Sequence, residues 1–153
     1  MTRYKALLVD DEQHCLRTLS AKLAWSNLPI DVVAKVDSVV RAREVLNSNA
    51  VDFVFLDVKM PNQDGFELFN VINTSKTDVI FTTAHEEFAL EAFKNHASGY
   101  LLKPISQRDL KPLMEDLINK RSEITKKKYS FGSFKIQKYH LCGICNRIIT
   151  FQV

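Results

Sequence analysis

Short apolar runs separated by amphipathic stretches set the pattern of this chain. Five runs are rich in β-branched and aromatic residues and are bounded by polar positions: 4–9, 30–36, 51–56, 79–81 and 100–102. Because these runs do not alternate between apolar and polar residues, they predict parallel strands that are buried on both faces. Between and after the runs, apolar residues recur at helical spacing, most clearly at Leu110, Leu113, Met114, Leu117 and Ile118.

Strand and helix patterns alternate five times, and this alternation predicts the fold. We expect an α/β domain with a doubly wound, five-stranded parallel sheet flanked by five helices and joined by right-handed crossovers. The domain is predicted to span residues 1–121, where 15 Lys and Arg stand against 17 Asp and Glu. Residues 122–153 carry 6 basic residues against 1 acidic residue. This shift predicts a short basic C-terminal tail or linker.

Length and composition exclude several classes of protein. A chain of 153 residues allows one sizeable core but not two large domains. The four glycines lie too far apart for either glycine-rich phosphate loop. The apolar run at the start is too short for a signal peptide or a membrane span, so we expect a cytoplasmic protein without membrane contact. Three cysteines, an odd number, do not predict a disulfide framework.

Polar side chains follow four of the five predicted strands. In doubly wound sheets, ligands bind beyond the carboxyl ends of the strands, so these side chains are expected to share one edge. They are Asp10 and Asp11 after the first strand, Asp57 after the third, Thr82 and Thr83 after the fourth, and Lys103 and Pro104 after the fifth.

Three carboxylates at one edge would repel one another unless a cation neutralises them. Hard oxygen ligands with room for water favour Mg²⁺ over zinc. A carboxylate beside such a metal, with a hydroxyl and a lysine nearby, can act as a nucleophile toward a phosphoryl group. The residues therefore predict a site where an aspartyl phosphate forms.

Four sequence blocks at these strand ends resemble a known family, the receiver domains of two-component response regulators. The blocks are LLVDDE, FLDVKMPNQDGFEL, FTTA and GYLLKPI, and the resemblance covers residues 3–121. It implies the flavodoxin-like receiver fold. The stretch FTTAHEEFALEAFKNHASGYLLKPI is most similar to receivers joined to a LytTR-type DNA-binding domain.

The resemblance implies roles for the acidic residues. Asp57 would accept a phosphoryl group from a phosphohistidine on a sensor histidine kinase. Asp10 and Asp11 would hold Mg²⁺ together with Asp57, and the backbone carbonyl of Lys59 would supply a further ligand. On this basis the chain is not an enzyme but a regulator that catalyses only its own phosphorylation and dephosphorylation.

The resemblance also implies how the domain responds. Thr83 would hydrogen-bond a phosphoryl oxygen, Lys103 would form an ion pair with it, and Tyr100 matches the aromatic residue that turns inward on activation. The response would control a partner, a transcriptional output, or homodimerisation through the face between the fourth and fifth helices. DNA would be contacted only through an output domain missing from this chain, because such a domain needs about 100 residues and 32 follow Arg121.

Two other functions remain open at this point. One is a protein-interaction module that keeps the receiver fold without phosphorylation. The other is a small phosphohydrolase with Asp57 as nucleophile and His85 as the nearby base. Single residues also have purely structural interpretations. Asp10 and Asp11 can cap a helix, Tyr100 can simply pack in a strand, and Cys15 lies on an apolar helical stripe as a small buried hydrophobic residue.

The tail carries weaker signals. Cys142 and Cys145 have the spacing of half a zinc or redox site, with His140 nearby, but a closed zinc site needs four ligands. The run 126–128 is lysine only, and it predicts a solvated linker in preference to a phosphate-binding segment. Two short strands are expected at 129–138 and 147–153.

Overall fold

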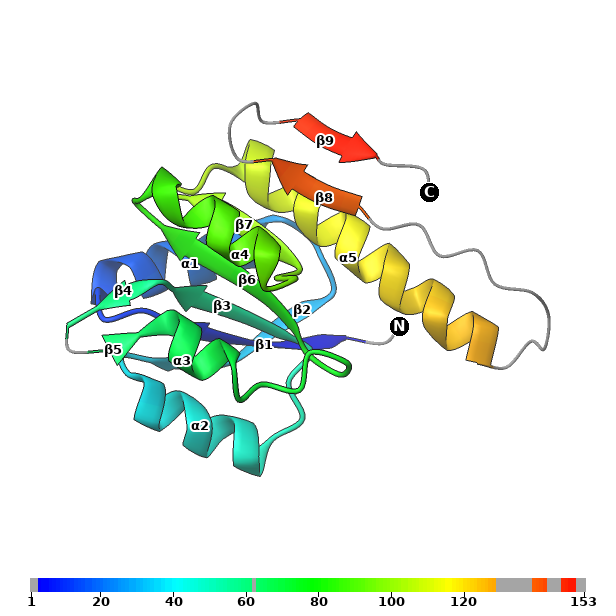
Figure 1. The fold of residues 1–153 in the computed structure, drawn as a ribbon. Helices are drawn as coiled ribbons and strands as arrows, with labels where there is room; N and C mark the ends of the chain where they lie inside the picture. The colour runs from blue at the N-terminus through cyan, green and yellow to red at the C-terminus, as the bar shows by residue number, and fades with distance from the viewer. Residues whose placement is uncertain (1–2, 62, 129–138, 143–146, 151–153) are drawn as a thin grey trace.

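The structure is a computed structural model that describes residues 3–61, 63–128, 139–142 and 147–150. Its centre is a five-stranded parallel sheet in the order β2-β1-β3-β6-β7 (Figure 1). The strands are β1 (Tyr4–Val9), β2 (Ile30–Val36), β3 (Phe53–Asp57), β6 (Asp78–Thr83) and β7 (Gly99–Leu102). This order confirms the doubly wound sheet that the sequence predicts.

Helices follow the strands and cover both faces of the sheet. They are α1 (Gln13–Trp25), α2 (Val39–Ser48), α3 (Gly65–Phe69), α4 (Ala89–Lys94) with the preceding 3-10 turn η1 (Glu86–Phe88), and α5 (Gln107–Lys128). Within the described residues, no helix is long and apolar enough to cross a lipid bilayer.

Alternate side chains of the strands enter two separate cores. Leu8 and Phe55 pack with apolar residues of α1 and α5, including Leu16 and Met114. Leu7, Leu56 and Phe81 instead belong to the core that includes residues of α2, α3 and α4. Both faces of every central strand are thus buried, which explains why the strand sequences are apolar throughout rather than alternating.

The segment after β3 differs from the expected pattern. Two-residue strands β4 (Lys59–Met60) and β5 (Gln63–Asp64) form a small antiparallel ladder that the sequence did not indicate. α3 begins where the Asp64 carboxylate accepts the N–H of Phe66, and it ends at Phe69. The apolar residues Phe66, Phe69 and Ile72 recur at helical spacing and predict a helix that includes Ile72, but Ile72 packs against the core from beyond the end of α3.

The C-terminal part of the chain continues from a long helix. α5 runs to Lys128, so the change in charge at position 121 falls inside a helix. Beyond it, β8 (Tyr139–Cys142) and β9 (Arg147–Thr150) form an antiparallel pair, with β8 near α4 and β7 (Figure 1). β9 lies within the second expected tail strand. The first, at 129–138, and the Cys145 position lie outside the described residues.

Arg121 joins α5 to the start of the two central strands. Its Nε lies 2.6 Å from Asp78 Oδ2 and its Nη1 lies 3.1 Å from Asp52 Oδ1. Its Nη2 donates to the backbone carbonyls of Asp52 and Lys76. Because these groups precede or begin β3 and β6, the guanidinium binds at the end of the strands opposite to the end that carries Asp10 and Asp57.

Candidate functional site

Three carboxylates meet at the carboxyl edge of the sheet. Asp10 follows β1, Asp11 comes next, and Asp57 ends β3, which is the neighbour of β1. One carboxylate oxygen from each residue lies within 4.8 Å of the other two. Asp10 and Asp57 are each only 5% exposed. The parallel pairing of β1 and β3 therefore helps to gather three acidic groups in one confined place.

Lys103 reaches into this cluster from the end of β7. Its Nζ lies 2.7 Å from Asp10 Oδ2 and 3.0 Å from Asp57 Oδ2, and its side chain is 14% exposed. Burial opposes the charge on Lys103, but hydrogen bonds to the two carboxylates raise its pKa above the ordinary value. The lysine is therefore held as an ammonium ion between two acidic groups.

The positive charge of Lys103 does not balance the negative charge of the three carboxylates. Burial raises the pKa of Asp57 above its usual value even though Lys103 and the Lys59 amide act in the opposite direction. The three carboxylates share the ammonium group of Lys103, and each offers oxygen atoms as ligands. Such a donor set suits a hard divalent cation such as Mg²⁺.

The chain after Asp57 is fixed by close backbone packing. The N–H of Lys59 lies 3.4 Å from Asp57 Oδ1, and the Lys59 ammonium lies over the ring of Phe88. Gly65 donates its N–H to the carbonyl of Val58 at 2.9 Å. A Cβ at Gly65 would stand 2.3 Å from the backbone oxygen of Asp57. Only glycine permits this approach, so the loop is held directly against the strand that carries Asp57.

Thr83 ends β6 and is completely buried. Its Oγ1 accepts a hydrogen bond from the backbone N–H of His85 at 3.2 Å. Its neighbour Thr82 is paired in register with Asp57. The hydroxyl of Thr83 thus binds the segment that leads from β6 to η1, at the end of the strand next to β3.

Tyr100 is directed inward, with 8% of its surface exposed. Its hydroxyl donates to the backbone carbonyl of His85. Burial raises the pKa of Tyr100 to about 12, and Glu87 and Glu86 act in the same direction. Thr83 and Tyr100 thus bind the two sides of one peptide segment at His85. The sequence contains no signal for this shared backbone partner, because any residue type offers the same N–H and C=O groups.

Tyr100→Phe is expected to lower the free energy of unfolding by about 1 kcal/mol, since it removes one buried hydrogen bond and leaves its carbonyl acceptor without this donor. Chemical denaturation measures the change. Tyr4→Phe is the matched control, because its hydroxyl makes no hydrogen bond to the described part of the protein. An equal loss in the free energy of unfolding of both variants would mean that the effect comes from solvation of the hydroxyl rather than from its hydrogen bond to His85.

The His85 side chain lies at the surface beside Glu87. Its Nδ1 lies 3.1 Å from Glu87 Oε1, its side chain is half-exposed, and its ring packs edge-on against Phe88. Beside the carboxylates, a cavity of about 480 Å³ opens between α1 and the segment after β7. Asp10, Thr82 and Lys103 line it. A reactant can therefore approach the cluster from this side.

Comparison with known proteins identifies the family. The sequence pattern of the response regulator receiver domain matches residues 6–115. The chain belongs to this family. A solved relative, the response regulatory domain of protein mrkE from Klebsiella pneumoniae, has a TM-score of 0.71 and 29% identity, and it covers 78% of this chain and 98% of that domain. The receiver fold and the family resemblance drawn from the sequence are confirmed.

The chain is also similar to parts of longer proteins. An uncharacterised response regulatory protein of Vibrio cholerae is 39% identical over 119 residues, which are 74% of this chain and 44% of the relative. Sensory transduction protein LytT of Bacillus anthracis is 32% identical over 139 residues, which are 89% of this chain and 56% of LytT. The receiver therefore has LytT-type relatives, as expected, and it spans about half the length of the curated relatives it matches.

Proposed function

We propose that this receiver accepts a phosphoryl group on Asp57 and thereby controls a partner. The observation that carries the proposal is the geometry of the acidic cluster. A buried carboxylate at the end of β3 lies within 4.8 Å of two others and 3.0 Å from a lysine ammonium. A purely structural role does not require three carboxylates in one confined place, because their repulsion opposes folding.

Asp10, Asp11 and Asp57, together with the backbone carbonyl of Lys59, are the groups proposed to hold Mg²⁺. The fit rests on the oxygen donors of the cluster and on its deficit of positive charge. When bound, Mg²⁺ supplies positive charge that neutralises the carboxylates and offsets charge on phosphoryl oxygens.

The reaction proposed for Asp57 is a displacement at phosphorus. A carboxylate oxygen of Asp57 forms a bond to phosphorus, the P–N bond to the donor histidine breaks, and the freed imidazole nitrogen takes a proton. Lys103, already 3.0 Å from Asp57 Oδ2, neutralises the developing charge on the phosphoryl oxygens. Thr83 donates its hydroxyl to one of these oxygens once the acyl phosphate exists.

The response proceeds through the segment at His85. A Thr83 hydroxyl drawn toward a phosphoryl oxygen changes the bond it accepts from the His85 N–H, while Tyr100 holds the carbonyl of the same residue. Phosphorylation shifts the equilibrium only if the phosphoryl group binds one arrangement better than the other. The loop between β6 and α4 is the element we propose to have these two arrangements.

The partners follow from the same family. A sensor histidine kinase is the proposed donor, and an output domain or a second copy of the receiver is the proposed recipient of the signal. Homodimerisation through the face between α4 and α5 is proposed from the family resemblance; Leu90 on α4 is 63% exposed, and β8 lies near α4 and β7 on this side of the domain. DNA would be contacted only through an output domain outside this chain.

Intact mass measurement tests the proposal. The protein is incubated with acetyl phosphate in the presence of Mg²⁺ and, separately, with a chelator. We expect a gain of one phosphoryl mass only with Mg²⁺, located on the peptide that contains Asp57. Labelling on a different residue would contradict the assignment. The absence both of labelling and of any Mg²⁺ binding would favour an interaction module that keeps the fold without the chemistry.

A further inference from the structure

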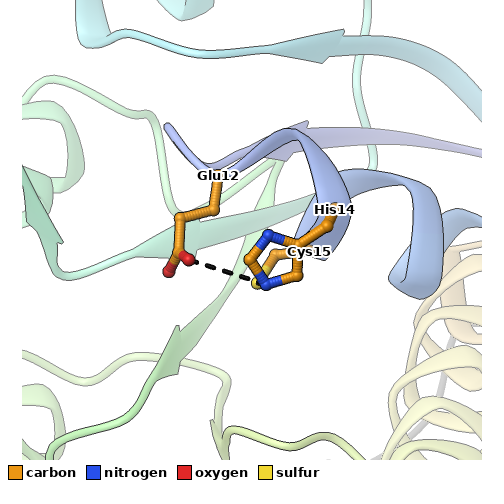
Figure 2. Close-up of side chains that lie close together, drawn as sticks. All are labelled: Glu12, His14 and Cys15. Carbon is orange, nitrogen blue, oxygen red and sulfur yellow. Dashed lines mark hydrogen bonds and ion pairs between the residues drawn. The ribbon is translucent and has the colours of Figure 1, made fainter.

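Three side chains of different chemistry lie together at the start of α1, outside the carboxylate cluster. They are Glu12, His14 and Cys15 (Figure 2). His14 Nε2 lies 3.4 Å from Cys15 Sγ and 3.6 Å from Glu12 Oε2. One ligand atom from each residue lies within 4.8 Å of the other two. A thiol, an imidazole and a carboxylate therefore face a common point.

The spacing of these atoms agrees with a zinc coordination shell. Zinc bonds of about 2.0–2.3 Å at tetrahedral angles place neighbouring N, O and S ligand atoms about 3.3–3.6 Å apart. The two separations from His14 Nε2, 3.4 Å to sulfur and 3.6 Å to oxygen, are close to these values. The ligand atoms of Glu12 and Cys15 lie within 4.8 Å of each other, so these two side chains must come together around His14 Nε2 to surround an ion.

The local structure leaves these groups available. Glu12 occupies the N-cap position of α1, yet its side chain makes no capping hydrogen bond. Cys15, which its place on an apolar stripe predicted to be buried, is only partly buried. All three residues line the cavity of about 480 Å³ beside α1. An ion and a water molecule as a fourth ligand can therefore reach the ligand atoms from solvent.

We propose that Glu12, His14 and Cys15 form a Zn²⁺ site that is separate from the oxygen cluster of Asp10, Asp11 and Asp57. Thiolate and imidazole donors favour Zn²⁺ over Mg²⁺, whereas carboxylates alone favour the harder ion. On binding, the Cys15 thiol releases its proton to solvent and forms a Zn–S bond. Water fills the remaining position, as in zinc sites with three protein ligands.

The two sites are linked through Glu12. Its Oε1 lies 3.8 Å from Lys103 Nζ, and its backbone N–H donates to Asp10 Oδ1 at 2.9 Å. Zinc bound to Glu12 draws this carboxylate away from Lys103 and adds positive charge beside the oxygen cluster. Bound Zn²⁺ therefore weakens the binding of Mg²⁺ at the oxygen cluster. The further consequence rests on the proposed function: with weaker Mg²⁺ binding, phosphorylation of Asp57 is slower.

The test uses the full chain without an affinity tag, with Cys142→Ser and Cys145→Ser as the parent. This background makes Cys15 the only thiol. Co²⁺ serves as the optical probe, because thiolate ligation gives a near-ultraviolet charge-transfer band. Zn²⁺ affinity is measured by displacement of Co²⁺ and by calorimetry in the parent, in Cys15→Ser and in His14→Gln. His96→Asn is the control, since His96 is an exposed histidine and asparagine tolerates its positive φ of 60°.

We expect one Co²⁺ per chain, with a thiolate band that Zn²⁺ removes and Mg²⁺ does not. Replacing a residue that binds the ion directly should reduce Zn²⁺ affinity more than replacing a residue that only supports a ligand. Cys15→Ser and His14→Gln should therefore each weaken Zn²⁺ binding about 100-fold or more. His96→Asn should bind as the parent does. A parent without the thiolate band, or equal Zn²⁺ affinity in the parent and Cys15→Ser, overturns the site.

The link between the sites has its own readout. In the parent, Zn²⁺ should slow the Mg²⁺-dependent mass gain with acetyl phosphate, while in Cys15→Ser the same Zn²⁺ concentration should leave the rate unchanged. Equal slowing in both proteins overturns the link. Zn²⁺ binding is also measured in Asp57→Asn, which lacks the proposed phosphorylation site. The zinc site is thus tested without any phosphorylation, and failure of one proposal can be distinguished from failure of the other.

Discussion

Asp57→Asn is expected to abolish phosphoryl labelling completely while leaving the fold intact. Asparagine keeps the shape of the side chain but offers no carboxylate oxygen to attack phosphorus. The variant should also be no less stable than the wild type when measured without divalent cations. Burial raises the pKa of Asp57, so the folded state disfavours the ionised carboxylate, and a neutral replacement removes this cost while Lys103 keeps Asp10 as a partner.

Two measurements check this prediction. Intact mass with Mg²⁺ and acetyl phosphate reports labelling, and urea denaturation in a chelator reports stability. Asp64→Asn is the matched control, because Asp64 caps α3 outside the cluster and asparagine caps helices equally well. The control should be labelled at the wild-type rate. A mass gain that persists in Asp57→Asn would show that another residue accepts the phosphoryl group.

Gly65→Ala should impair both stability and labelling. The new Cβ would stand 2.3 Å from the backbone oxygen of Asp57 and 3.1 Å from Val58 Cα. Backbone atoms at the end of β3 cannot rotate away, so the loop and strand must separate, and we expect a loss of about 3 kcal/mol in the free energy of unfolding. A displacement of about 1 Å at a nucleophile can cost about 100-fold in rate, and labelling should slow by that order.

Gly99→Ala provides the comparison for this prediction. A Cβ at Gly99 would also be crowded, at 2.8 Å, but by the Cδ2 methyl of Leu113. This side chain can change rotamer, so a loss of about 1 kcal/mol and a nearly unchanged labelling rate are expected. Chemical denaturation and the mass assay on both variants separate the cases. Similar labelling rates in the two variants would exclude a role for the contact between Gly65 and Asp57.

The sequence predicts the inner strands of the parallel sheet well because burial on both faces requires consecutive apolar residues. For β2 the prediction of burial on both faces is wrong, because this strand lies at the edge of the sheet and alternates between buried and exposed positions. It also places the cluster well: acidic groups that directly follow neighbouring parallel strands must meet at one edge, as Asp10 and Asp57 do. The roles assigned to these residues stay predictions, and the mass assay tests them.

Other features depend on interactions that no periodicity encodes. The β4–β5 ladder is two residues long on each side, too short for an alternating pattern to appear. α3 stops at Phe69, although the apolar spacing continues to Ile72, because packing against the core does not require a helical backbone. The contacts of Thr83 and Tyr100 with His85 use main-chain groups, which the sequence cannot distinguish from those of any other residue.

Four hydrogen bonds from Arg121 hold α5 against the start of β3 and β6. The helix has 22 residues, which corresponds to a length of about 33 Å, and the seven residues beyond Arg121 account for about 10 Å of it. Arg121 therefore fixes α5 at one point on the sheet, and the helix continues beyond that point to Lys128.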